Sequence, residues 1–538
     1  MSVNRTNLSR RNFITAGVIG ATGAFAGLTG CAPSGKKSDS KAAVSDSAEK
    51  KYSWETAPDP IDEGSITETQ EADIVIVGAG TAGLVCALSA AEEGKSIIVI
   101  AKDEAPSGQG GSHFAMNTKF LNAEGKAPDT FTAINHELQL ACYMVDSEQY
   151  KVFANESGVA MDWYQNLMET GGLSCTLEAP AYNCGGISEE YWGSHVFYGG
   201  PNDAPFGDLP DELEVLKNLI TKDYGQQIFF NTTAQQLVRE DGGRVSAVIA
   251  TNADGKYIKY VGTKAVVLAT GDYGNNEEMK EKWCSYVAGM SSMKMPANNT
   301  GDGHKMAMWI GAAMQPNERH AAMVFGPSDI YKSLSVNESG IRFANERVSN
   351  GLAAMEILQQ PGKHTFSLWD SQYASKVPTF ATRLNTQPDT PEMVQASFDA
   401  GVADGSILKA DTITELAKLI DVDATTLQET VDRYNELCAA GTDTDYYKSS
   451  EFMIPVATAP FYAIENKASL LVTLGGLDVT ADMEVRDTEG KVIEGLYALG
   501  AIAGNFYANT YTTYFCGVNL GRNVCYGYRT GKQLAALK

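Results

Sequence analysis

Several chemistries are excluded by what the sequence lacks. Its nine cysteines never occur as C-x-x-C or C-x-x-C-H, the spacings of thiol-redox sites, zinc ribbons and c-type haem attachment. They form no ferredoxin-like run either, so we expect neither an iron–sulfur cluster nor a metal site. Basic residues are few, with 42 lysines and arginines against 66 aspartates and glutamates and a formal net charge of −24. Such an acidic chain repels polyanions, so nucleic acid is not an expected partner.

Long apolar runs are missing beyond the N-terminal region, so we expect no transmembrane helix in the mature chain. Residues 9–14 read S-R-R-N-F-I and precede a run of small apolar residues at 16–30, which resembles a twin-arginine export signal. Residues 28–31 resemble a lipobox in which Cys31 carries the lipid. The alternative is an ordinary secretory signal with a chance cysteine. We therefore expect an exported protein on the outer face of the cytoplasmic membrane, held there by a lipid anchor only.

The first folded segment is expected after a tether. Residues 1–31 form the predicted signal, and residues 32–70 are rich in Ser, Lys, Asp, Glu and Ala without an apolar period. Such a composition is typical of a flexible linker. From residue 71 onward the sequence alternates between strand and helix patterns, which favours an α/β fold.

A glycine motif lies between the first predicted strand, residues 72–77, and a helical stretch. Gly78 permits a tight turn, Gly80 lets the backbone approach a pyrophosphate, and Gly83 lets helix and strand pack closely. A second strand follows at residues 95–100. This strand–turn–helix–strand context makes G-x-G-x-x-G a credible dinucleotide site of the Rossmann type.

The acidic residue that usually binds ribose at the end of the second strand is absent. Ala101, Lys102 and Asp103 stand there instead. The ribose contact is therefore lost, made by Asp103, or made by the backbone.

Five further glycine-rich segments occur in a characteristic order, at 108–112, 269–272, 300–303, 495–500 and 517–521. Together with the first motif they resemble the FAD-binding-2 superfamily of fumarate reductases, urocanate reductases and 3-ketosteroid dehydrogenases. The resemblance implies noncovalent FAD on a Rossmann-type domain interrupted by an inserted, mobile α+β capping domain. It divides the chain into a first FAD-binding part, a capping domain and a second FAD-binding part, at residues 71–291, 292–450 and 451–538.

The same resemblance implies which residues contact FAD. Ala501 occupies a position that is usually Glu in G-L-Y-A-x-G-E, so one usual ribityl contact is not expected. The predicted cofactor-binding residues are Gly78, Gly80, Gly83, Lys102, Gly110, Gly111, Ser112, Thr270, Gly271, Asp302, Gly500, Ala501, Asn519 and Leu520.

The catalytic residues of fumarate reductases do not carry over. Residues 340–346 match the family's G-x-R-F-x-N-E, but Asn350 stands where the family has its proton-donating arginine. Val472 replaces the histidine before T-x-G-G, and Tyr514 falls where the substrate-binding arginine is expected. No Arg, Lys or His occurs from Val492 to Gly521. Because a dicarboxylate requires cationic donors, this site favours a neutral, apolar or aromatic molecule.

Two tyrosines are the leading catalytic candidates. Tyr511, in N-T-Y, resembles the T-Y-P tyrosine of 3-ketosteroid dehydrogenases, whose hydroxyl acts on the substrate carbonyl. Tyr514 lies three residues further on and could exchange roles with it. His320 and Arg347 are weaker candidates, because a lone histidine is more often structural and Arg347 could pair with Glu346 in place of reaching the site.

The sequence therefore predicts an FAD-dependent reductase of a C=C bond conjugated to a carbonyl in a neutral or aromatic small molecule. No second dinucleotide motif and no haem motif are present, so we expect a separate, membrane-linked electron donor such as a cytochrome. The alternatives are the reverse reaction on a steroid-like ketone, and a flavin electron carrier without turnover.

Overall fold

The computed structural model describes residues 51–180, 190–201, 209–294, 296–316, 319–379, 388–509, 511 and 514–538. The predicted export signal and Cys31 lie outside the described residues. Within the described ranges, no helix combines the length and the apolar character needed to cross a bilayer.

The expected tether is shorter than predicted, because residues before 71 already pack on the fold. Trp54 is buried, and its ring centroid lies 4.8 Å from that of Trp283. Trp309 Nε1 donates a hydrogen bond of 2.9 Å to the carbonyl oxygen of Trp54. Strand β1 begins at Ile66. A single buried tryptophan thus anchors a segment whose composition resembles a linker.

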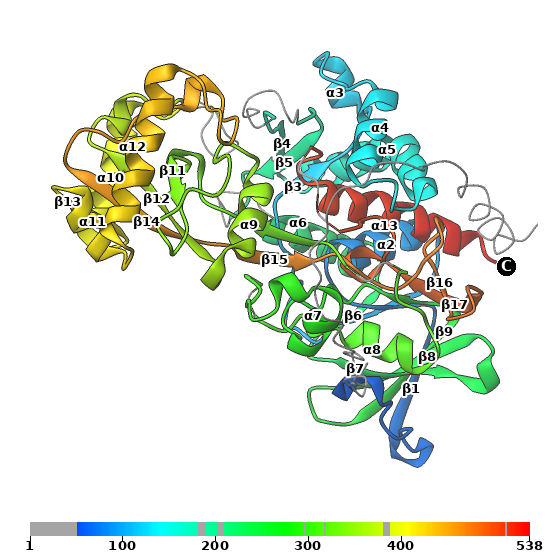
Figure 1. Ribbon diagram of the computed structural model, residues 1–538. Helices are drawn as coiled ribbons and strands as arrows, with labels where there is room; N and C mark the ends of the chain where they lie inside the picture. The colour runs from blue at the N-terminus through cyan, green and yellow to red at the C-terminus, as the bar shows by residue number, and fades with distance from the viewer. Residues whose placement is uncertain are drawn as a thin grey trace, which may run out of the picture. The chain divides into compact units, whose positions relative to one another are not determined.

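The centre of the fold is an eight-stranded sheet (Figure 1). β1 pairs in parallel with β2 on one side and with β9 on the other, so that Ile76 lies opposite both Val99 and Val267. From Ile74 to Val77 its β-branched residues are buried, as expected for the part of a parallel strand that is covered on both faces. This confirms the predicted α/β class. The strands in spatial order are β16 (Glu484–Arg486), β17 (Val492–Ala498), β9 (Tyr257–Leu268), β1 (Ile66–Val77), β2 (Ile97–Ile100) and β6 (Gln227–Phe229).

A hairpin extends this sheet from β9. β7 (Thr233–Arg239) pairs with β8 (Val245–Thr251), and β8 pairs antiparallel with the first half of β9. β8 and the first half of β9 thus form a hairpin. The last residues of β9, 265–268, are buried, and β9 pairs with β1 along its whole length.

Two helices from opposite ends of the chain lie side by side on the sheet (Figure 1). They are α2 (Thr81–Glu92) and α13 (Val518–Ala536), and α5 (Ser147–Thr170) packs against α13. Gly531 allows the close approach, since a Cβ there would lie 2.7 Å from the carbonyl oxygen of Cys86. The chain's last helix therefore helps to position the first glycine turn.

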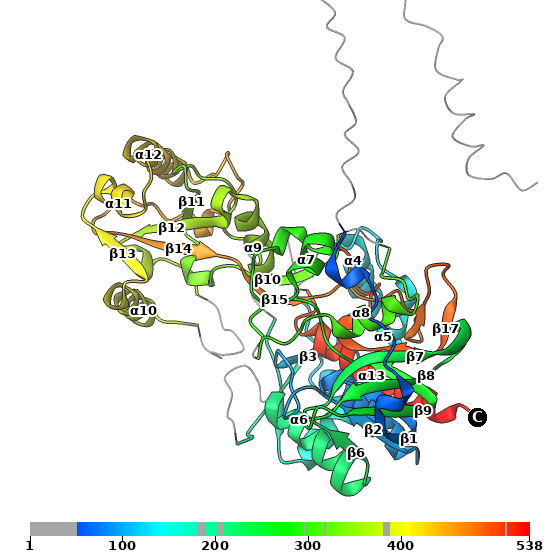
Figure 2. The same cartoon turned by 90° about the horizontal axis from the view of Figure 1, so that it is seen from below.

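The inserted segment builds its own four-stranded sheet (Figure 2). Its order is β11 (Leu334–Val336), β12 (His364–Asp370), β14 (Phe461–Lys467) and β13 (Ile407–Ala410). Thr412 caps α11 (Ile413–Leu419), and Asp423 caps α12 (Ala424–Ala440). β14 follows residue 450, so the insertion extends further than its predicted end. The sheet's other helices are α9 (Asn350–Gln359) and α10 (Pro391–Asp404).

Two smaller sheets complete the described fold. In one, β10 (Ala322–Phe325) pairs antiparallel with β15 (Ser469–Thr473), directly after the insertion's last strand. The other contains β3 (Ser112–Phe114), β5 (Ser194–Tyr198) and β4 (Ser174–Leu177). The remaining α-helices are α3 (Lys119–Ala123), α4 (Thr130–Leu140), α6 (Leu209–Asn218), α7 (Glu277–Trp283) and α8 (Asp302–Trp309).

Candidate active site

A cavity of about 370 Å³ lies at the carboxyl ends of β1, β2 and β9. Every predicted cofactor-binding residue except Gly83 lines it. The crevice beyond the carboxyl ends of parallel strands is where ligands bind in open α/β sheets. The predicted positions brought together on its wall are Gly78, Gly80, Lys102, Gly110, Gly111, Ser112, Thr270, Gly271, Asp302, Gly500, Ala501, Asn519 and Leu520.

The glycine turn has the geometry that the motif predicts. Gly78 has a φ of +118°, and a Cβ there would lie 2.2 Å from the carbonyl oxygen of Ala269. A Cβ on Gly83 would lie 2.1 Å from the carbonyl oxygen of Gly78, so Gly83 packs beneath the turn and not on the cavity wall. Gly80 is the N-cap of α2, whose first N–H groups suit a pyrophosphate.

An ion-pair cluster occupies the end of the second strand. Lys102 Nζ lies 2.7 Å from Asp302 Oδ2, and Lys305 Nζ lies 2.9 Å from Asp302 Oδ1. Burial opposes ionisation of Asp302, but its bonds to both lysines outweigh this effect and lower its pKa to about 2. Asp103 also lines the cavity, where Asn298 Nδ2 donates to its Oδ1. Lys102 is therefore paired with Asp302. Of the residues that follow β2, Asp103 is the carboxylate that lines the cavity and could make the ribose contact.

The residues present fit a flavin dinucleotide. The wall combines a helix N-terminus with backbone at Gly78 and Gly80 for the phosphates. It adds apolar side chains such as Met306 and Leu520, which suit a planar ring system. These contacts require no covalent bond.

The structure separates the two candidate tyrosines. Tyr511 lines the cavity and is 8% exposed, with its ring centroid 5.4 Å from that of Tyr507. Burial, together with the neighbouring Tyr507 and Cys516, raises the pKa of Tyr511 well above its ordinary value. Its hydroxyl therefore keeps its proton at neutral pH. Tyr514 does not line the cavity, and its ring centroid lies 4.7 Å from that of His136, with the two rings tilted by 37°.

Neither of the weaker candidates lines the cavity. His320 is fully buried, its Nδ1 lies 2.7 Å from the Tyr273 hydroxyl, and its ring stacks on Trp283. Burial lowers the pKa of His320 to about 3, so it is neutral. Arg347 Nη1 donates to the carbonyl oxygen of Asp329 at 3.0 Å. Both side chains are held by packing away from the cavity wall, so we assign them no catalytic role.

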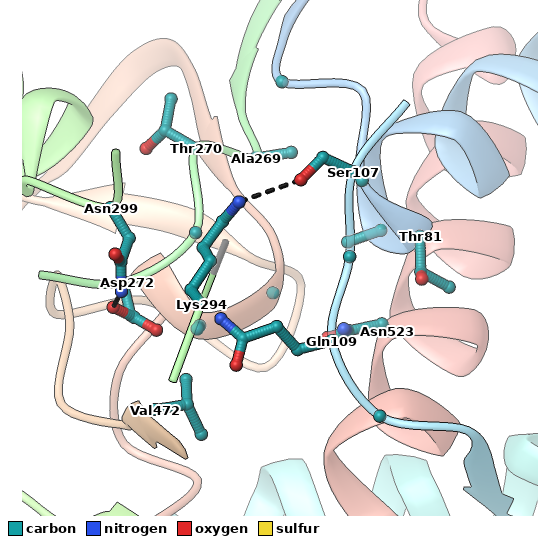
Figure 3. Close-up of a pocket in the computed structure, with 18 of the residues that line it drawn as sticks. Thr81, Ser107, Gln109, Ala269, Thr270, Asp272, Lys294, Asn299, Val472 and Asn523 are labelled. Atoms are coloured by element: carbon teal, nitrogen blue, oxygen red, sulfur yellow. Dashed lines mark hydrogen bonds between the residues drawn. The ribbon is translucent and has the colours of Figure 1, made fainter. Parts of the chain in front are cut away.

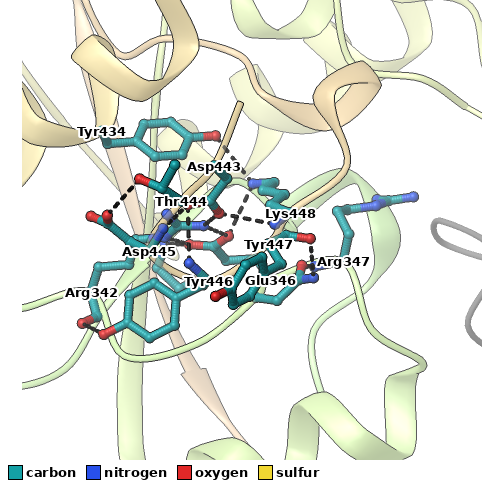
Figure 4. A network of polar contacts seen from close by, with 12 residues as sticks. Arg342, Glu346, Arg347, Tyr434, Asp443, Thr444, Asp445, Tyr446, Tyr447 and Lys448 are labelled. Atoms are coloured by element: carbon teal, nitrogen blue, oxygen red, sulfur yellow. Dashed lines mark hydrogen bonds and ion pairs between the residues drawn. The ribbon is translucent and has the colours of Figure 1, made fainter. Parts of the chain in front are cut away.

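The G-x-R-F-x-N-E motif builds a buried ionic network in the insertion (Figure 4). Arg342 bonds to Glu346 and to Asp443, each at 2.8 Å. The ammonium group of Lys448 lies 3.1 Å from Glu346, and neither side chain is more than 2% exposed. Arg347 extends away from this network in the figure. The motif's charged residues, Arg342 and Glu346, are therefore engaged within the insertion's own ionic network.

The sequence interpretation missed polar residues at one end of the cavity (Figure 3). Asp272, Asn299 and Lys294 all line it. Burial raises the pKa of Asp272 to about 6, although bonds from Gly274 and Asn299 and the charge of Lys294 act in the opposite direction. The sequence feature that could have identified Asp272 is an acidic residue directly after Ala269-Thr270-Gly271.

Asn350 also lines the cavity, at the first position of α9. Its Oδ1 accepts a hydrogen bond from the backbone N–H of Gly326. The side-chain NH₂ group of Asn350 can therefore still donate a hydrogen bond. Asn350 cannot supply the proton that an arginine at this position supplies in the family.

Comparisons with known proteins agree with this geometry. The family model described as FAD binding domain matches residues 73–513. A vinyl phenol reductase of Lactiplantibacillus plantarum is 27% identical, covering 86% of this chain and 96% of the relative. A digoxin reductase of Eggerthella lenta is 28% identical, covering 99% of this chain and 97% of the relative.

Solved structures give the same fold. The open conformation of a flavocytochrome c3 fumarate reductase superposes with a TM-score of 0.65 at 25% identity, covering 90% of this chain and 82% of that one. A 3-ketosteroid-delta4-(5alpha)-dehydrogenase of Rhodococcus jostii RHA1 gives a TM-score of 0.69 at 22% identity, covering 89% and 100%. The second likeness concerns the fold alone.

Proposed function

The chain belongs to the FAD binding domain family and is an FAD-dependent oxidoreductase acting on CH–CH bonds, and from this premise we propose that it reduces a conjugated C=C bond. The bond is conjugated to a carbonyl in a neutral or aromatic small molecule. When bound, FAD supplies the two-electron chemistry. The residues of the chain bind and orient the substrate and deliver a proton.

The observation that best supports this proposal is that one end of the cavity is lined by apolar side chains. Met323, Phe325, Leu471 and Val472 line it there, and Met323 lies opposite Val472 in the β10–β15 pair. Among the described residues that line the cavity there is no arginine and no histidine, and its two lysines, Lys102 and Lys294, are bonded to Asp302 and Ser107. A buried carboxylate without a cationic partner costs several kcal/mol, on the order of the penalty for an unpaired ion. A neutral, apolar substrate avoids that penalty.

Tyr511 is the proposed proton donor. Its hydroxyl is protonated at neutral pH, and its ring belongs to the cavity wall. A neutral tyrosine can protonate a carbon or polarise a carbonyl oxygen without requiring a charged substrate. The two relatives support the substrate class, since one is named for reducing a vinyl phenol and the other for reducing digoxin.

The reverse reaction, desaturation of a steroid-like ketone, is the second candidate. It is favoured by the position of Tyr511 on the cavity wall, because this residue resembles the tyrosine that acts on the carbonyl in 3-ketosteroid dehydrogenases. A flavin electron carrier without turnover is the third. For all three candidate functions we propose that FAD is bound noncovalently.

The electron donor and the cellular location are further proposals. The chain carries neither a second dinucleotide motif nor a haem motif, which supports a separate donor such as a membrane-anchored cytochrome. Export through the twin-arginine signal and lipid attachment at Cys31 would hold the enzyme beside that donor on the outer face of the cytoplasmic membrane.

Mild denaturation is expected to release all of the yellow chromophore as intact FAD, because the cavity offers hydrogen bonds and packing for it. Chromatography of the supernatant identifies the flavin, and the spectrum of the native protein should show no haem. A flavin that stays with the denatured chain, or FMN in the supernatant, would contradict this expectation.

Turnover with chemically reduced viologen tests the proposed reaction. Neutral enones should oxidise the viologen catalytically, and the saturated ketones with an artificial acceptor should react more slowly. Faster desaturation than reduction would favour the second candidate. Absence of turnover in both directions, with full FAD content, would leave the electron carrier as the better account.

A further inference from the structure

Asp272 places a carboxyl group on the cavity wall that the proposed reaction does not use. It follows β9 directly, is 4% exposed and lines the cavity with Asn299 and Val472 (Figure 3). Its Oδ1 accepts hydrogen bonds from the backbone N–H of Gly274, at 2.6 Å, and from Asn299 Nδ2. Within the described part of the chain, no hydrogen bond engages Oδ2. The carboxylate is thus fixed through one oxygen, while the other is available to a ligand.

Its neighbours locate Asp272 at the apolar end of the cavity. The backbone N–H of the next residue, Tyr273, donates to Thr473 Oγ1 at 3.2 Å. Thr473 follows Val472 on β15, and Val472 pairs with Met323. The carboxylate therefore lies beside the residues that we assign to the substrate.

Among the described residues, no cation is bonded directly to Asp272. Lys294 Nζ donates to Ser107 Oγ at 2.8 Å (Figure 3). It lies 4.0 Å from Asp103 Oδ2, and its charge acts on Asp272 only from a distance, lowering the pKa of Asp272. Lys102 is paired with Asp302. Its pKa of about 6 leaves Asp272 mostly ionised at neutral pH. Asp272 is therefore a negatively charged hydrogen-bond acceptor on the cavity wall.

We propose that Asp272 determines specificity by accepting a hydrogen bond from a hydroxyl or N–H group of a neutral substrate. This inference rests on the proposed reduction of a conjugated C=C bond and narrows its substrate class. The same charge repels carboxylates from this end of the cavity. A donor group on the substrate is favoured at this site, because Oδ2 of the buried carboxylate has no donor of its own among the described residues.

The test compares two aromatic enones that differ in one donor. Para-hydroxybenzylideneacetone carries a phenolic hydroxyl, and para-methoxybenzylideneacetone carries a methyl ether in its place. The wild-type holoenzyme is expected to prefer the phenol by roughly 10- to 100-fold in kcat/KM, the range for a hydrogen bond to a charged group. Asp272→Asn should reduce this preference to about 3-fold or less, as a charged hydrogen bond becomes a neutral one. The change should appear mainly in KM for the phenol.

Glu356→Gln is the matched control. Glu356 is another partly buried carboxyl with a raised pKa, about 7, but it lies on α9 outside this cavity. This variant should keep the wild-type preference. An equal preference in Asp272→Asn and wild type would overturn the role of Asp272, as would equal turnover of the two enones by wild type. Loss of FAD from Asp272→Asn would also overturn it, because the carboxylate would then serve the cofactor. Failure of wild type to reduce either enone would contradict the proposed function as well.

Discussion

The Tyr511→Phe variant is expected to lose roughly 10²- to 10⁴-fold in kcat, the usual contribution of a positioned acid or base. The substitution keeps the ring and its packing against Tyr507 but removes the only hydroxyl of this residue. Because the hydroxyl acts in the transition state, kcat and kcat/KM should fall together. Steady-state rates with reduced viologen and the best enone measure the effect. FAD content and the rate of flavin reduction by viologen should remain near wild type, since neither depends on the hydroxyl.

Tyr514→Phe is the informative comparison, because Tyr514 lies off the cavity wall and packs against the ring of His136. It should have a small effect on turnover. A large effect of Tyr514→Phe with a silent Tyr511→Phe would exchange the two roles. A rise in KM alone for Tyr511→Phe would make this tyrosine a binding residue, and two silent variants would refute a tyrosine mechanism.

Fumarate is expected to be a poor substrate, at least about 10²-fold below the best neutral enone in kcat/KM, because each lost charged contact costs about that much. Val472 and Tyr514 stand where the resemblance implies cationic substrate ligands, and Asn350 stands where it implies the proton donor. Asp272 adds a negative charge at the same end of the cavity. Viologen-linked rates on both substrates measure the ratio.

Cinnamate and methyl cinnamate provide a control for size and aromaticity in this comparison, because they share one carbon skeleton and differ in charge. The ester should react far better than the acid. Fumarate turnover comparable to that of the best enone would show that the cavity binds carboxylates through residues outside this account.

The parts of the fold that sequence predicted are those fixed by local pattern. The Gly78 turn and the elements around it, β1, α2 and β2, depend on neighbours within a few residues. The segment around Trp54 was missed because its order comes from Trp283, far along the chain. The end of the insertion was misplaced because β14 is recognised only by its pairing with β12.

The same distinction between local sequence pattern and tertiary packing applies to the site. The cofactor positions predicted from glycine order, except Gly83, lie on one cavity wall. Spacing alone could not distinguish Tyr511 from Tyr514, because only tertiary packing brings Tyr511 and not Tyr514 to the cavity. The sequence assigned no role to Asp272, because its orientation depends on Asn299 and its position depends on contacts with β15.

Anaerobic reoxidation of the reduced, FAD-loaded protein tests the central claim most directly. The flavin is reduced without excess reductant, and its absorbance is followed after addition of a neutral enone, of fumarate, or of buffer. The account predicts rapid and complete recovery of oxidised flavin with the enone, with formation of the saturated ketone, and slow recovery with fumarate. Recovery with fumarate and not with any neutral enone would contradict it.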